Sequence, residues 1–169
     1  MASNIALENQ HIVHFMPVSR VAGNEDMAQG GPHSLRVSMG GAQRAVFLII
    51  VNTCAAGASE MGCTAWCAQC DQQTIGGTTQ KVSFRYRIIS ASDTQGTIYE
   101  AYSFSFGHVS DRIYEIEIDA ANLAADTGYE YVQLIVSEFS TTGIAVDGAY
   151  ACILQGLRHK RNVLGTQTD

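Results

Sequence analysis

The clearest pattern of hydrophobic and polar positions lies between residues 112 and 138. From 113 to 119 the chain separates an apolar face from an acidic one, because successive side chains of a β-strand point to opposite faces. One face holds Tyr114, Ile116 and Ile118, and the other holds Ile113, Glu115, Glu117 and Asp119. This pattern predicts a half-buried antiparallel strand, then a tight helical bend over 119–125 and a second strand that reaches Glu138.

Two further runs predict strands of different kinds. Residues 82–89 alternate between large apolar side chains and a face that carries Arg85 and Arg87, which predicts a strand with one apolar and one basic face. Residues 43–51 contain the continuous apolar run AVFLIIV at 45–51. A run of this kind is typical of a strand that is buried on both faces.

Shorter strand-like segments complete the chain. They cover residues 12–16, 35–38, 63–70, 97–106 and 149–157, and polar or Gly-rich loops at 52–62, 71–80, 92–96 and 143–147 separate them. About eight strands with one helical turn predict an all-β fold, either an antiparallel β-sandwich or a jelly-roll-like domain. We expect an extended N-terminal arm over 1–34, the β-domain over 35–158 and a C-terminal tail over 159–169.

Composition narrows the classes of partner. The chain has 169 residues, enough for one domain, and only 15% are charged, so we expect partners to cover part of its surface. A net charge of −6 argues against nucleic acid as the main partner, and the only basic run, 158–161, is short. The longest apolar run is too short to cross a bilayer, and residues 1–10 lack the pattern of a signal peptide. We therefore expect no membrane association, and synthesis in a reducing cytoplasm.

The cysteines are the strongest candidates for chemistry. Cys54, Cys63, Cys67 and Cys70 supply four thiolates, the number that tetrahedral zinc requires. However, Cys63 and Cys67 share one face of a predicted strand while Cys70 points to the other. We therefore favour small buried hydrophobic residues around Trp66, with a metal site and a disulfide of Cys54 as alternatives. Cys152, in the last predicted strand, is assigned to the core.

No other arrangement of residues predicts an active site. The five histidines are scattered, and no motif fixes a Cys/His nucleophile. Glu115 and Glu117 lie about 7 Å apart by pleat geometry, a separation found in some glycosidases, but acidic pairs of this spacing are common on solvated strands. Phosphate-binding and nucleophile-elbow motifs are absent from the sequence. We predict that the protein is not an enzyme and needs no cofactor.

Four short stretches carry a resemblance to a known family. They are 46–50 (VFLII), 84–96 (FRYRIISASDTQG), 114–123 with 128–132 (GYEYV), and 154–158 (LQGLR). In these stretches the chain resembles the decoration or cement proteins, small auxiliary head proteins on the outside of the capsids of tailed bacteriophages. The bend Asp119-Ala-Ala-Asn-Leu123 is similar to the family's Asp-Ala-x-x-Leu bend. The Cys-rich stretch from Cys54 to Cys70, His159 and the arm before Leu35 depart from the family's pattern.

The resemblance implies a non-enzymatic virion protein that is made in the host cytoplasm and binds the capsid exterior. Its expected partners are the major capsid protein and other copies of itself, often in a trimer, and its expected role is to stabilise the shell. The matched positions belong to the core and turns, so no contact residue is carried over. Two alternatives stay open: a tail, fibre or carbohydrate-binding module, and a Cys-liganded metal or redox protein. A sugar platform would use exposed aromatic side chains among Tyr99, Tyr102, Phe104 and Phe106.

Overall fold

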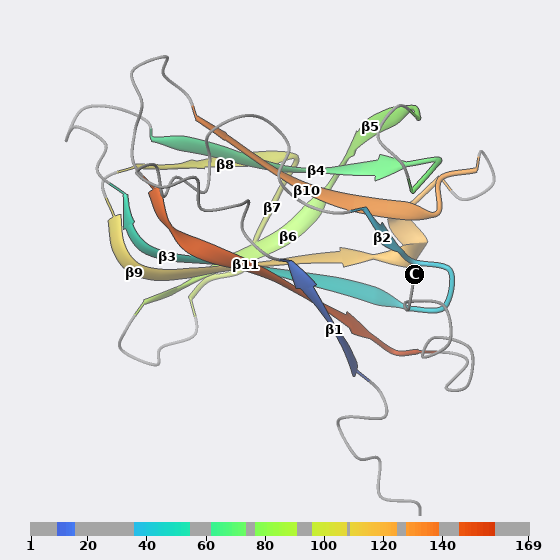
Figure 1. The fold of residues 1–169 in the computed structure, drawn as a ribbon, viewed down its shortest axis with the longest axis horizontal. Helices are drawn as coiled ribbons and strands as arrows, with labels where there is room; N and C mark the ends of the chain where they lie inside the picture. The colour runs from blue at the N-terminus through green and yellow to red at the C-terminus, as the bar shows by residue number, and fades with distance from the viewer. Residues whose placement is uncertain are drawn as a thin grey trace, which may run out of the picture.

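Two antiparallel β-sheets packed face to face form the protein, as Figure 1 shows. The computed structural model describes residues 10–15, 36–54, 62–73, 77–90, 96–107, 109–124, 128–138 and 146–157. The strands in these residues are β1 (Gln10–Phe15), β2 (Val37–Ser38), β3 (Arg44–Cys54), β4 (Cys63–Cys70), β5 (Thr79–Val82), β6 (Phe84–Ser90), β7 (Tyr99–Ala101), β8 (Ser103–Phe106), β9 (Val109–Asp119), β10 (Tyr131–Glu138) and β11 (Val146–Gln155). The expected all-β sandwich is confirmed.

The strand order places β3 and β9 in the middle of the larger sheet. Sheet A has six strands in the order β1-β11-β3-β9-β6-β7, and sheet B has the order β2-β10-β4-β5. The remaining strand, β8, pairs with the first half of β4, while β5 pairs with the second half. In the N-terminal arm, β1 pairs with β11 from Gln10 to Phe15, so this part of the arm is held by sheet A.

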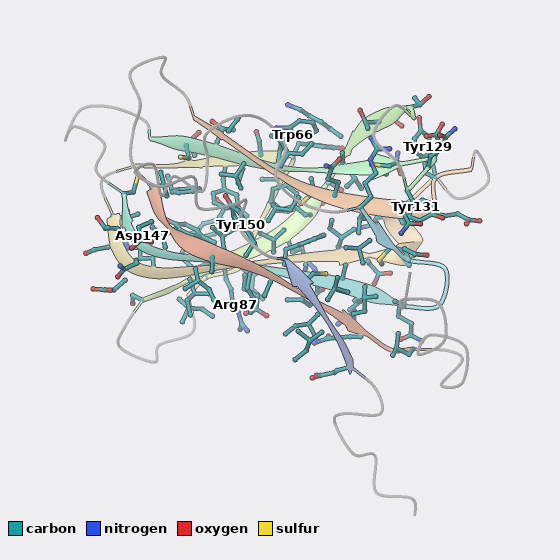
Figure 2. The ribbon with its side chains drawn as sticks, viewed as in Figure 1. Trp66, Arg87, Tyr129, Tyr131, Asp147 and Tyr150 are labelled. Carbon is teal, nitrogen blue, oxygen red and sulfur yellow. The ribbon has the colours of Figure 1, made fainter. Side chains whose placement is uncertain are left out.

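The core lies between the sheets and follows the predicted alternation. From sheet A it contains Phe47 and Ile49 of β3 and Ile116 and Ile118 of β9, all fully buried. Figure 2 shows Tyr150 of β11 between the two layers. Burying each such side chain contributes about 1.5–3 kcal/mol to folding. The predicted inner face of β9 is therefore confirmed.

A short cap fixes the bend after β9. Asp119 accepts a hydrogen bond from the Ala121 N–H at 2.9 Å, and η1 (Ala120–Asn122) follows as one turn of 3-10 helix. The Ala120 N–H donates to the Gln43 carbonyl at 2.8 Å, which ties the bend to the start of β3. Leu123 then packs into the core. The predicted helical turn is confirmed within 119–125.

Two segments expected to be single strands are each divided between the sheets. Residues 82–89 break at Ser83, between β5 of sheet B and β6 of sheet A, and residues 97–106 break at Tyr102, between β7 and β8. Both sheets face the same core, so Val82 and Phe84 point inward from opposite layers. At Ser83 the alternation continues across the crossing, and the sequence pattern gives no sign of it. At Tyr102 it shifts by one residue, because Ala101 and Phe104 both face the core. The expected count of about eight strands was too low partly for this reason.

Loop boundaries also differ from the expectation. β3 continues to Cys54, into the predicted loop at 52–62, and β5 begins at Thr79, inside the predicted loop at 71–80. Similarly, β11 begins at Val146, before the expected start at 149. In each case pairing with a neighbouring strand extends the element: Cys54 lies opposite Val109 and Val146, and Thr79 lies opposite Cys70. Residues 55–61, 74–76 and 139–145 lie outside the described residues.

The core assignment predicts that substituting two isoleucines by alanine changes the free energy of unfolding by very different amounts. Ile116 is fully buried in β9, whereas Ile98 is 62% exposed before β7. We expect Ile116→Ala to lower the free energy of unfolding by about 2–5 kcal/mol through lost burial and a residual cavity. Ile98→Ala should change it by less than about 0.5 kcal/mol. Urea denaturation of both variants measures the difference, and equal effects would contradict the assigned core.

Candidate functional site

The outer face of sheet A brings together an acidic strand and a basic strand. The acidic residues of β9 and the arginines of β6 alternate with core residues, so both sets project away from sheet B. The register pairs Arg85 with Glu117 and Arg87 with Glu115. Figure 2 shows Arg87 on the side of sheet A that faces away from sheet B. The acidic face of β9 therefore lies beside the basic face of β6.

Ion pairs join these strands and the start of β3. Arg87 Nε donates to Glu115 Oε2 at 2.6 Å, and Arg85 forms an ion pair with Glu117. Arg44 of β3 lies 3.6 Å from Glu117 and 3.7 Å from Asp119. We call these six residues the ion-pair ladder; three arginines and three carboxylates leave it without net charge. The carboxylates considered as a glycosidase pair, Glu115 and Glu117, are thus engaged by arginines.

Two hollows meet at Arg44. One, of about 280 Å³, lies over the ladder and is bordered by Ile98. The other, of about 450 Å³, lies between the Gly40–Gly41 turn and η1. Both are lined partly by backbone and by charges that are already paired. These properties fit a surface that contacts another protein better than they fit a catalytic cleft.

Beside the ladder, a group of apolar residues lies on the outer face of sheet A, bordered by the exposed hydrogen bond from Asn52 to Asp147. Cross-strand pairs such as Ile12 with Ile153 and Ile50 with Ile113 place apolar side chains next to one another. Ile12 is 65% exposed and Ile50 is 39% exposed. We call this group the apolar outer patch: Ile12, Val46, Leu48, Ile50, Ile89, Ile113, Ala149, Ala151 and Ile153. The expectation that 45–51 is buried on both faces holds fully only for the inner face.

Long side chains of sheet B and its flanking residues cover the outer face of this sheet. The Lys81 ammonium lies 5.0 Å from the centroid of the Trp66 ring, a cation–π contact. Arg36 donates to the Gln133 side chain at 3.4 Å and to the Gln72 carbonyl at 2.9 Å. Figure 2 shows Trp66 on the outer side of this sheet. Beneath these side chains Ala68 and Cys70 are fully buried.

The candidate cysteines do not converge on one point. Cys63 and Cys67 belong to the main core, while Cys70 belongs to the small cluster on the outer face of sheet B, as the alternation predicted. Cys54 ends β3, and all of these cysteines are buried and stand outside any disulfide. Within the described ranges, no group of three or more His, Cys, Asp or Glu side chains is placed to hold a metal ion. The side chains of all five histidines fall outside those ranges.

Burial also lowers the reactivity of the core thiols. It raises the pKa of Cys152 to about 12, and it raises the pKa of Cys67 still further from its usual value, with Cys152 adding to the effect. The pKa of Cys70 is raised by burial and by Asp71, against the opposing effect of Arg36. A thiol that keeps its proton is a poor nucleophile and a poor metal ligand.

The aromatic residues expected to form a sugar platform separate into two groups. Phe104 and Phe106 are buried and pack against Tyr114. Tyr99 and Tyr102 are exposed, and Tyr99 stacks on Tyr86 with the ring centroids 5.3 Å apart. Only the two exposed tyrosines are therefore available to a ligand.

Comparison with known proteins gives no further guide. No protein-family model matches the chain, no curated protein matches its sequence, and no solved structure matches it. In the part of the chain that the structure describes, no helix has the length and apolar character needed to span a membrane.

The sequence alone did not predict that the ion-pair ladder and the apolar outer patch lie on the same face of one sheet. The ladder had a signal, because two alternating runs of opposite charge, at 85–87 and 115–117, favour neighbouring strands. The patch also had a signal in the sequence: the run at 45–51 is apolar at every position, whereas a strand with one buried face needs apolar residues only at alternate positions. Neither signal fixed the order of the strands across the sheet.

The ladder predicts a measurable coupling between Arg87 and Glu115. Both side chains are about one quarter exposed, so we expect a double-mutant cycle with Arg87→Met and Glu115→Gln to give about 0.5–1 kcal/mol of stabilising coupling. High salt should reduce it. A matched cycle of Lys81→Met with Glu115→Gln, on opposite sheets, should give none. Equal coupling in the two cycles, measured by urea denaturation, would refute the assignment.

The raised thiol pKa values predict lower stability at alkaline pH. Cys67 and Cys152 hold their protons more tightly when folded, so their contribution is fully present below about pH 9 and is lost as pH rises toward about 12. Each thiol should add up to about 1.4 kcal/mol per pH unit to this loss. Urea denaturation from pH 8.5 to 10.5 should show a shallower dependence in Cys67→Ala/Cys152→Ala. Ile116→Ala, which is destabilised without losing a thiol, should keep the wild-type slope.

Proposed function

We propose that the protein is a non-enzymatic structural protein that binds the outside of a tailed-bacteriophage capsid and stabilises the shell. The observation that carries this proposal is the outer face of sheet A, where an apolar outer patch lies beside a neutral ion-pair ladder on a two-sheet scaffold. A broad surface of this kind suits protein contact. The buried thiols and paired carboxylates offer no competing catalytic arrangement among the described residues.

The resemblance supplies the more specific part of the proposal. Its matched stretches fall on β3, on β6 and the residues after it, on β9 with η1, at the start of β10, and at the end of β11. These are scaffold positions, so the likeness concerns the framework and the contact residues are this chain's own. The proposed partners are the major capsid protein and further copies of this chain, and the proposed location is the capsid exterior after synthesis in the host cytoplasm.

Repetition over a lattice makes modest contacts sufficient for this role. A capsid presents the same site many times, and subunits that engage more than one site gain effective concentration. An outer face with apolar area and compensated charges can supply modest protein contacts of the assembly, to the shell or between copies, without a deep pocket. Shell stabilisation then follows from mass action, because the bound protein favours the assembled state.

A glycan-binding role is the second candidate. The exposed Tyr99 and Tyr102 lie at the edge of sheet A, where aromatic rings can stack on sugars. Two exposed rings offer a smaller contact surface for a glycan than the outer face of sheet A offers for a protein, so we place this function second. A glycan-array screen with binding lost in Tyr102→Ala would favour it.

An inventory of particles tests the proposed function. We expect mass spectrometry of virions produced by the genome that encodes this chain to find the protein in a fixed, high ratio to the major capsid protein. Removal of the protein should lower the temperature at which the shell releases DNA. A trace amount in purified particles, or a signal confined to tails, would contradict the proposal.

A further inference from the structure

The central strand β3 carries apolar residues on both faces, and on the outer face they become exposed toward Ile50: Val46 is buried, whereas Ile50 is not. Its inner residues, Phe47 and Ile49 among them, are fully buried in the sandwich. Its outer residues include Leu48, which is half-buried, and Ile50, which is 39% exposed. In Figure 1 no labelled strand lies on the outer side of sheet A. Continuous apolar strands are typical of sheets that are covered on both sides.

The apolar residues of the outer face, which range from buried to exposed, form a continuous area. The register links Ala149 to Ile50, Ile50 to Ile113, and Ile113 to Ile89, so one apolar row crosses four strands. Five residues on each of β3 and β11 and one outer position on each of β1, β9 and β6, at about 4.8 Å per strand and about 3.4 Å per residue, give an area on the order of 250 Å². Contiguous apolar areas of a few hundred Å² on a monomer are often functional.

The charges next to the patch bear on which partner can cover it. The chain carries a net charge of −6, so two copies repel each other over most orientations. The ion-pair ladder has no net charge, and its arginines and carboxylates already bind each other. Two copies that meet through the patch and the ladder therefore bring no excess of like charge together. On this face the charge penalty for self-association is therefore small.

We propose that the apolar outer patch is the contact between copies of this chain, with the ion-pair ladder at its rim. This inference rests on the proposed function for its place in an assembly, and it names the surface of self-association. Small residues Ala149 and Ala151 beside Leu48 and Ile50 leave room for side chains of an opposing sheet to interdigitate. The patch and ladder from two copies bury roughly 1,000 Å², near the lower limit of specific interfaces, so association in the micromolar range is expected.

Substitution of Ile50 tests this surface directly. We expect sedimentation velocity of the full chain between 1 and 100 µM to show an oligomer, and Ile50→Glu to weaken association at least about tenfold, since it places an unpaired charge in the contact. Tyr102→Glu, at a 62% exposed apolar residue outside the patch, should associate as the wild type does. A monomeric wild type at 100 µM, or equal effects of the two variants, would overturn the proposal.

A second variant protects the test against misfolding. Ile12 is 65% exposed in the edge strand β1, so Ile12→Glu should fold with a wild-type circular dichroism spectrum and still weaken association. Benzoylphenylalanine at position 50 should also crosslink to a second copy in solution. If position 50 crosslinks to no second copy, the assigned surface is wrong.

Binding to purified capsids separates this inference from the proposed function. If Ile50→Glu loses capsid binding while the wild type is monomeric, the shell covers the patch, so the inference fails and the function stands. If the wild type associates through Ile50 but binds no capsid, the inference stands and the function fails.

Discussion

The antiparallel pairing of β3 with β9 joins the two halves of sheet A, and the other elements depend on it. This pairing sets Phe47 beside Ile116 and Ile49 beside Tyr114 on the inner face. β11 and β1 extend the sheet from β3, while β6 and β7 extend it from β9. A shift of the register by one residue would turn the core residues of a strand to the outer face, so burial fixes this pairing.

The same register organises the outer face. Glu115 lies opposite Leu48 on one side and opposite Arg87 on the other, so the apolar outer patch and the ion-pair ladder meet within β9, between Ile113 and Glu115. Each carboxylate of the ladder has an arginine partner. Covering an unpaired charge with protein is strongly unfavourable, whereas paired charges at the rim of an interface are tolerated. The arrangement therefore allows an apolar contact surface on an acidic protein.

The alternation of apolar and polar residues assigned side chains to the correct face of the sheet wherever a strand stays in one sheet. It assigned both faces of β9 and separated Cys63 and Cys67 from Cys70 before any contact was known. It failed at Ser83 and Tyr102, where the chain passes from one sheet to the other. At Ser83 both sheets share the core and the inward alternation continues from Val82 to Phe84, so the local pattern contains no signal of the change. At Tyr102 the alternation shifts by one residue, because Ala101 and Phe104 both face the core.

The sequence by itself determined the fold class and the character of each strand face, since the period of two is a property of the extended backbone. It indicated that 45–51 needs cover on both sides and that β6 and β9 carry opposite charges. Only the tertiary structure decided that these strands are neighbours, which converts an acidic and a basic face into a neutral ladder. It also decided that no described element covers the outer side of β3. Strand order depends on contacts between residues far apart in the chain, and local patterning does not encode them.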